Sequence, residues 1–436
     1  MPDLPYALIG AGPMGLACAR QLAKYHIPFR GFELHTGVGG LWDIQNPQST
    51  MYHSAHLISS KTMTEFREFP MGEEVATYPD HQSVCQYLNN YATHFKLRRF
   101  FSFGVKVLHT RPLAKGRWLV RWQDEHGTHE AHYAGLLIAN GNLHKPNRPA
   151  LPGQFTGLQL HACDYKSPLL FKDKRVLIIG CGNSACDIAV DAVHYAASVD
   201  LSVRRGYHFL PKFIAGRPID TLGQGMALPK GIKRLLHTAL IKWIQGKPEN
   251  YGLPNPNHKL YESHPVVNSL VLHHLGHGDI KPRSDIQAVV ENTVIFDNGD
   301  QQEYDIILQA TGYKLDFPFI DKAHLNWKGH APDLFLNIFH PEHKNLFVMG
   351  MVEAAGLGWQ GRAEQAELVA LLIKAQKESN QAVLKGFERQ QKQHKPLNGG
   401  IDYLPLARMA YYVHKETYLN ALRGRISQLK QGLGYA

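Results

Sequence analysis

The sequence predicts an α/β fold that contains two similar strand–turn–helix units. The first is an apolar run over 6–9, the turn Gly10-Ala11-Gly12-Pro13-Met14-Gly15, and an expected helix over 16–25. The second is an apolar run over 175–179, the turn Gly180-Cys181-Gly182-Asn183-Ser184-Ala185, and an expected helix over 186–197. A glycine-rich turn between strand and helix brings free backbone N–H groups to a pyrophosphate. Both units are therefore predicted to be Rossmann-like dinucleotide-binding units.

The first turn carries three glycines with separate tasks. Gly10 allows the tight turn, Gly12 lets the backbone approach a pyrophosphate, and Gly15 lets the helix lie close to the sheet. Glu33 ends the next apolar stretch, 27–32. A carboxylate there accepts hydrogen bonds from a ribose 2′-hydroxyl and repels a 2′-phosphate. The unit is thus predicted to bind FAD; the alternative is a structural turn followed by an unrelated acid.

The second unit differs at the corresponding position. Its next expected strand, 200–203, is followed by Arg204 and Arg205 in place of an acid. Two guanidinium groups suit a 2′-phosphate, so this unit is predicted to bind NADPH. The alternative is that both arginines lie in a solvated turn.

Composition narrows the class of protein. The 436 residues, 44% hydrophobic and 19% charged, indicate a globular chain of two or three domains. The net charge of +10 is dispersed, which favours anionic cofactors over nucleic acid. We expect no membrane span, because no apolar run approaches ~20 residues, and no signal peptide, because the first strand begins near residue 5. Five cysteines without a small-domain framework favour the cytoplasm.

The remaining chain shows further periodic segments separated by turns. Prolines at 146, 149 and 152 indicate a connection between domains. A capped amphipathic helix is expected over 80–95. Strands are expected over 103–109, 117–122, 135–139, 286–296 and 303–308, with turns at 125–127 and 297–299, and helices over 231–244 and 364–379.

Several motifs occur together in one order. The pattern F-x-G-x-x-x-H-x-x-x-Y is matched by Phe155-Thr-Gly157-Leu-Gln-Leu-His161-Ala-Cys-Asp-Tyr165. Two further motifs lie before and after it in the chain: Gly39-Gly40-Leu41-Trp42 and Ala310-Thr311-Gly312-Tyr313. With these motifs and the second glycine turn, the chain resembles the flavin-containing monooxygenases over nearly its full length. Residues 264–268 also look like a family segment. Related Baeyer–Villiger enzymes usually carry Trp where Tyr165 stands, which favours the former group.

The resemblance implies an FAD domain formed by residues 1–165 and 286–436, with a smaller NADPH domain, 166–285, inserted in it. It places His161 and Tyr165 in the linker that couples the domains. The cofactor-binding residues that it implies are Gly10, Gly12, Pro13, Met14, Gly15, Glu33, Gly40, Leu41, Trp42 and Thr311 for the FAD domain, and Gly180, Gly182, Asn183, Ser184, Ala185, Arg204 and Arg205 for NADPH.

The resemblance also implies a reaction. NADPH would reduce FAD, dioxygen would form a 4a-hydroperoxyflavin, and a thioether sulfur or amine nitrogen would take one oxygen atom. The cofactor carries this chemistry, so the protein needs a dry pocket more than a nucleophile–base pair. The family commonly has Asn where Ile58 stands. Ile58 cannot form hydrogen bonds, so Ser59 or His56 would have to compensate at this catalytic position.

Other functions fit parts of the sequence. Cys181 and Cys186 have the C-x4-C spacing of some NADPH-dependent disulfide reductases, although buried structural thiols are the favoured interpretation. Baeyer–Villiger oxidation of a ketone, a poorly coupled NADPH oxidase, and a flavoprotein that senses redox state without turnover are further alternatives. His273 and His277 lack a third ligand, so no metal is expected. The expected partners are a small-molecule substrate and dioxygen, with a homodimer left open.

Overall fold

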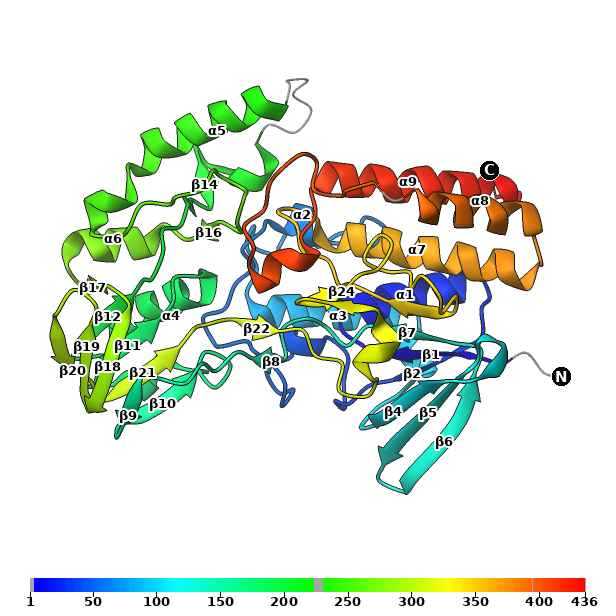
Figure 1. Ribbon diagram of the computed structural model, residues 1–436, viewed down its shortest axis with the longest axis horizontal. Helices are drawn as coiled ribbons and strands as arrows, with labels where there is room; N and C mark the ends of the chain where they lie inside the picture. Colours follow the sequence, from blue (N-terminus) through cyan, green and yellow to red (C-terminus); the bar gives the residue numbers. More distant parts are fainter. Residues whose placement is uncertain (1–3, 223–229, 394, 436) are drawn as a thin grey trace.

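The computed structural model describes residues 4–222, 230–393 and 395–435, which form two lobes. Figure 1 shows the lobe with both chain ends on the right and the green second lobe on the left. A five-stranded parallel sheet organises each lobe. The α/β class with two Rossmann-type domains is therefore confirmed.

The first sheet has the order β25-β7-β1-β2-β3. Its strands are β1 (Tyr6–Ile9), β2 (Phe29–Phe32), β3 (Phe101–Ser102), β7 (Gly135–Ile138) and β25 (Leu346–Val348). The central strand β1 is fully buried between β2 and β7. Helix α1 (Pro13–Lys24) packs on α7 (Gly358–Lys377), which also packs on α8 (Gln381–Lys392) and α9 (Lys415–Gly432). These helices form the layer above the sheet in Figure 1, so the turn between β1 and α1 lies at one edge of a rigid core.

The second sheet has the order β10-β21-β11-β12-β17. Its strands are β10 (Leu158–His161), β11 (Arg175–Ile179), β12 (Ser198–Ser202), β17 (Ile280–Arg283) and β21 (Ile306–Gln309). This sheet extends past both expected domain boundaries, because β10 precedes residue 166 and β21 follows residue 285. Alternating polarity reveals a strand but not its pairing partner, so the sequence did not show that β21 pairs with β10 and β11.

Smaller elements surround the two sheets. The first lobe carries α2 (Lys61–Thr64), α3 (His81–His94), and the antiparallel strands β4 (Lys106–Pro112), β5 (Trp118–Asp124) and β6 (Gly127–Tyr133), with β23 (Trp327–Lys328) and β24 (Ala331–Pro332). The second carries α4 (Asn183–Val193), α5 (Lys230–Gln245), α6 (Leu270–His277), and a sheet of β9 (Gly153–Phe155), β18 (Ile286–Glu291), β19 (Thr293–Phe296) and β20 (Gln301–Glu303). Its paired short strands are β13 (Phe209–Leu210) with β16 (Val266–Val267), and β14 (Phe213–Ile214) with β15 (Arg217–Pro218).

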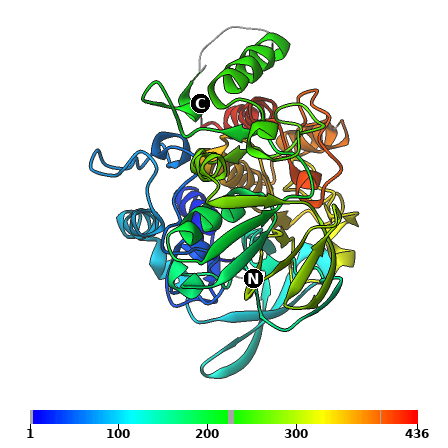
Figure 2. The same cartoon turned by 90° about the vertical axis from the view of Figure 1, so that its left-hand side faces the viewer.

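Figure 2 faces the second lobe and shows the long green helix α5 at its outer edge. In the described part of the chain, no helix is both long and apolar enough to cross a membrane.

Several expected elements change their bounds, among them the helix expected over 364–379, which is α7, and the strand expected over 303–308, which falls on the separate strands β20 and β21. The helix expected over 186–197 is α4, which begins at Asn183 directly after the glycine turn and ends at Val193. The strand expected over 286–296 is two antiparallel strands, because Glu291 adopts a left-handed φ of 52° between them. The helix expected over 80–95 is confirmed as α3, whose first turn is capped by Asp80 through the Ser83 N–H at 2.7 Å.

The chain crosses between the lobes along a short antiparallel pair, β8 (Lys145–Pro146) with β22 (Tyr313–Lys314). The Thr311 hydroxyl donates to the Asn147 carbonyl at 2.5 Å, and the Asn147 amide donates to the Thr311 carbonyl at 3.3 Å. His161 Nε2 donates to the Gly312 carbonyl at 3.1 Å. These bonds fix both crossings relative to each other.

Candidate active site

A cavity of about 1580 Å³ opens between the lobes and the C-terminal segment 399–416. Most predicted site residues line it: Gly10, Gly12, Pro13, Met14, Glu33, Gly40, Leu41, Trp42, His56, Ile58, Ser59, Gly182, Asn183, Ser184 and Ala185. Five predicted residues lie outside its lining: Gly15, Gly180, Arg204, Arg205 and Thr311. The structure therefore brings both glycine turns to one space, although they are 170 residues apart in the chain.

The first glycine turn has little room for side chains at two positions. Gly10 has a φ of +106°, and a Cβ there would lie 2.4 Å from the Ala139 carbonyl oxygen. A Cβ on Gly15 would lie 1.9 Å from the Gly10 carbonyl oxygen. Gly12 instead faces the backbone of Gly40 at ordinary contact distance, 3.6 Å from a built Cβ. Gly10 and Gly15 thus form the turn, and Gly12 leaves the start of α1 accessible.

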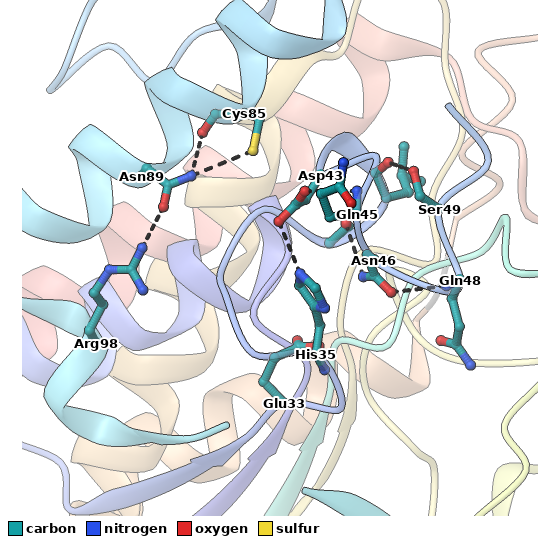
Figure 3. Close-up of polar contacts among 12 residues, drawn as sticks. Glu33, His35, Asp43, Gln45, Asn46, Gln48, Ser49, Cys85, Asn89 and Arg98 are labelled. Carbon is teal, nitrogen blue, oxygen red and sulfur yellow. Dashed lines mark hydrogen bonds and ion pairs between the residues drawn. The ribbon is translucent and has the colours of Figure 1, made fainter. Parts of the chain in front are cut away.

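Glu33 is buried at the end of β2 and already holds the first turn. Its carboxylate accepts the Ala11 N–H at 2.5 Å and the His35 N–H at 2.8 Å. Burial raises the pKa of Glu33, while these N–H groups oppose the shift. His35 Nε2 in turn contacts the Asp43 carboxylate at 3.0 Å (Figure 3). A fixed carboxylate therefore faces the cavity beside the glycine turn.

The loop that carries Leu41 and Trp42 is held by side chains that the sequence analysis did not single out. Asn46 donates to the Gly40 carbonyl at 3.1 Å, and the Ser49 hydroxyl donates to the Leu41 carbonyl. Figure 3 shows these contacts beside the Asn89 contacts to Cys85 and Arg98. The sequence did offer one indication of this: Asn46 lies in a turn, where Asn side chains readily form hydrogen bonds with nearby backbone groups.

The second glycine turn repeats the first with a more open backbone. Gly180 has a φ of +113°, and a Cβ there would lie 2.7 Å from the Ala310 carbonyl oxygen. A Cβ on Gly182 would meet no described atom within 4 Å. Asn183 uses its side-chain oxygen to accept the Val267 N–H at 2.7 Å. Within the described residues, no side chain caps the N-terminus of α1 or α4, and neither first turn contains an acid.

A comparison with known proteins identifies this arrangement. A family model described as flavin-binding monooxygenase-like matches residues 5–414. The chain belongs to this family. Human flavin-containing monooxygenase 1 is 30% identical over 455 residues, which cover 97% of this chain and 84% of the human protein. The rat N-oxide-forming dimethylaniline monooxygenase 2 is 28% identical over 373 residues, covering 80% and 69%.

Solved structures share the fold of this monooxygenase. S-allyl-L-cysteine S-oxygenase from Allium sativum has a TM-score of 0.66 at 20% identity, with 100% of this chain and 89% of that chain covered. Cyclohexanone monooxygenase in its rotated conformation has a TM-score of 0.72 at 17% identity, covering 100% and 98%.

The protein is an FAD- and NADPH-dependent monooxygenase, and its cavity fits both cofactors. Two helix starts, each behind a glycine turn, have no side-chain cap among the described residues, and free N–H groups at a helix start suit a pyrophosphate. Gly182 leaves its backbone open to close approach.

The arginines expected to bind the NADPH 2′-phosphate follow β12. Arg204 is exposed and makes no hydrogen bond or ion pair with any described residue. Arg205 is half-buried, and its guanidinium lies 4.9 Å from the centre of the Tyr207 ring. Asp200, the acid within β12, is buried and receives bonds from Arg283 and Tyr304 at 2.7 and 2.6 Å. The charged group without a partner in the described chain at the end of β12 is therefore the Arg204 cation, because the Asp200 carboxylate is already paired.

Ile58 lines the cavity of the monooxygenase and packs on an apolar cluster of Leu210, Ile219, Ile241, Leu260 and Val267. The Thr64 hydroxyl donates to the Ser60 carbonyl at 3.0 Å, so the Ser59 hydroxyl is the donor in its 2.7 Å contact with Thr64. His56 Nδ1 donates to the Ser54 carbonyl at 2.7 Å. Ser59 and neutral His56 therefore have no side-chain proton left to donate into the cavity.

Two aspartates on α4 join the lobes, and sequence reasoning missed both. Asp187 accepts the Tyr52 hydroxyl at 3.0 Å and the Asn268 amide at 2.6 Å. Asp191, one helical turn later, accepts the Tyr165 hydroxyl at 2.8 Å and the Ser54 hydroxyl. Burial raises the pKa of Asp187. These bonds tie the helix behind the second glycine turn to the segment that leads to Ile58.

The features behind two alternative functions lie elsewhere. Cys181 and Cys186 are both buried thiols, with sulfurs 3.9 Å apart, and neither lines the cavity. The hydrogen bond between them and burial raise the pKa of Cys186, which disfavours the reactive thiolate. His274 pairs with Asp279 at 2.8 Å, and the described residues contain no group of three metal-ligating side chains.

Proposed function

We propose that this monooxygenase transfers one oxygen atom of dioxygen to a soft nucleophile, a thioether sulfur or an amine nitrogen. The observation that carries the proposal is the single cavity, which joins both glycine turns to an apolar wall around Ile58. Bound FAD supplies the redox chemistry between NADPH and dioxygen. The protein's part is to bind both cofactors and to exclude water from the reacting groups.

In this proposal the first turn and its neighbours hold FAD. The N–H groups at the start of α1 meet the pyrophosphate, and Glu33 receives a ribose hydroxyl. The backbone bonds to Glu33 support this role, because they fix the carboxylate beside the turn. Leu41 and Trp42 line the cavity on the loop that Asn46 holds, and they would border the bound flavin.

The second turn would hold NADPH. The N–H groups at the start of α4 meet its pyrophosphate, and Arg204 pairs with the 2′-phosphate, with Arg205 beside it. The unpaired state of Arg204 in the described chain supports this role. Gly15, Gly180 and Thr311 do not line the cavity, so in this proposal they support the turns that hold the cofactors.

The test is product analysis with isotope-labelled dioxygen. Purified holoenzyme, NADPH and a neutral thioether should yield a sulfoxide that carries one labelled oxygen. NADPH consumption without labelled product contradicts oxygen transfer and favours an oxidase. A labelled ester from a cyclic ketone, with the thioether unchanged, moves the function to Baeyer–Villiger oxidation. Disulfide reduction by NADPH without oxygen uptake favours a reductase.

The proposal also includes a cytoplasmic location, because all five cysteines are free thiols. Cell fractionation followed by immunoblotting tests this. A homodimer stays a prediction that light scattering of the purified protein measures.

A further inference from the structure

The cavity has a third charged region besides the two glycine turns. It is formed by the loop before α7, the first turns of α7, and segment 399–416. Its charged lining residues include Glu353, Arg362, Arg408 and Lys415. This region adjoins α2, since a Cβ on Gly358 would lie 2.0 Å from the Met63 carbonyl oxygen. It therefore lies close to the segment that carries Ile58 and Ser59.

The cavity lining of this region holds three cations, Arg362, Arg408 and Lys415, and two acids, Glu353 and Glu416. Arg408 pairs with Glu353 at 3.1 Å, which neutralises both. Arg362 donates to the Gly358 carbonyl at 2.9 Å, and its other N–H groups have no acceptor among the described residues. Lys415 makes no hydrogen bond or ion pair within the described chain, although Asp220 and Glu416 attract it from beyond contact distance. Two cations thus remain without a contacting acid.

Burying these two cations without a contacting acid is energetically unfavourable. Both side chains are half-buried, and burial lowers the pKa of Arg362 and that of Lys415. A dehydrated charge without a partner destabilises a fold unless a ligand compensates it. In the proposed function the two pyrophosphates bind at the starts of α1 and α4. The remaining anion must come from another molecule or from another part of a cofactor.

The geometry points to a substrate carboxylate. A guanidinium offers a rigid fork of N–H donors that matches a carboxylate with two parallel bonds. We propose that this monooxygenase prefers thioethers that carry a carboxylate, with Arg362 as the residue that binds it and Lys415 as a second cation. The inference rests on the proposed oxygen transfer and adds a substrate class to it. Arg362 is then a specificity-determining residue.

The experiment compares 3-(methylthio)propanoate with its neutral amide, 3-(methylthio)propanamide. These probes differ only in charge, so the ratio of their kcat/KM values reports recognition of the carboxylate. The wild-type enzyme should favour the carboxylate by about 10- to 100-fold, the usual range for a charge-assisted contact. Arg362→Gln should bring the ratio close to one, and Arg362→Lys should retain part of it.

The ratio is measured within each variant, so a loss of folded enzyme or flavin cancels. Arg111→Gln is the matched control, because Arg111 is an exposed residue of β4 outside the cavity lining. It should keep the wild-type ratio. FAD content and the KM for NADPH are measured in parallel for each variant.

Three outcomes overturn the inference or its basis. Equal kcat/KM values for both probes in the wild-type enzyme contradict carboxylate recognition and leave oxygen transfer intact. An unchanged preference in Arg362→Gln, or loss of FAD together with equal losses on both probes, assigns the guanidinium to another role. If neither probe yields a sulfoxide while NADPH is consumed, the proposed function itself fails.

Discussion

The two glycine turns share one backbone design and differ in the side chain that follows the second strand. In the first lobe Glu33 is buried and held by two N–H groups. In the second, Arg204 is exposed and has no partner in the described chain. The backbone can thus serve the phosphates that both cofactors share, and a single side chain can distinguish their riboses. Substitutions at matched positions of the two turns test this division.

The largest effect is expected on stability, at a glycine whose position leaves no room for a side chain. Gly15→Val should destabilise the protein by about 3 kcal/mol or more, because a Cβ there would lie 1.9 Å from the Gly10 carbonyl oxygen. Denaturant unfolding measures the change. Gly424→Val on α9, where a Cβ would meet no described atom within 4 Å, is the control and should cost less. Equal losses would contradict the steric explanation.

Gly12 and Gly182 should separate the two cofactors. Their positions tolerate a Cβ in the protein itself, so valine should act mainly by blocking a pyrophosphate. Gly12→Val should abolish FAD retention, measured as flavin released per chain. Gly182→Val should keep its FAD and weaken NADPH binding. Loss of FAD in both variants would mean that the turns do not act independently.

A smaller effect is expected for Arg204. Removing one charge-assisted contact should reduce NADPH affinity about 10- to 150-fold. Arg204→Ala should therefore raise the KM for NADPH and leave the KM for NADH nearly unchanged. Arg205→Ala is the informative comparison, because Arg205 already stacks on Tyr207. If Arg204→Ala raises both KM values equally, the side chain has a structural role.

The smallest effect is expected at Ile58, which lines the cavity onto which both glycine turns open. Ser59 and neutral His56 donate to other residues, so an added amide would be a new donor toward the cavity. Ile58→Asn should lower the hydrogen peroxide released per NADPH oxidised, measured with a peroxide assay. Ile58→Leu is the control for volume. A peroxide yield that is unchanged or higher in Ile58→Asn would show that another group already has this function.

Local features of both lobes could be predicted from the sequence, whereas contacts between distant segments could not. Helix α3 and the turn residues of both units were predictable because caps, periodicity and glycine φ angles are local properties. The partners of β21 were not, because strand pairing is non-local: β21 joins β10 and β11 across more than a hundred residues. The cofactor role of Thr311 stays a prediction, and the structure adds that its hydroxyl donates to the Asn147 carbonyl at the crossing between the lobes.

The sequence by itself determined the two dinucleotide units, the contrast between Glu33 and Arg204, and the unusual Ile58, because each depends on residue type at a short, regular spacing. Only the tertiary structure decided that both turns open on one cavity, that Asp187 and Asp191 join the lobes, and that Arg362 and Lys415 line that cavity without a contacting acid. These features depend on side chains brought together from distant segments, and burial and charge pairing exist only after the chain has packed.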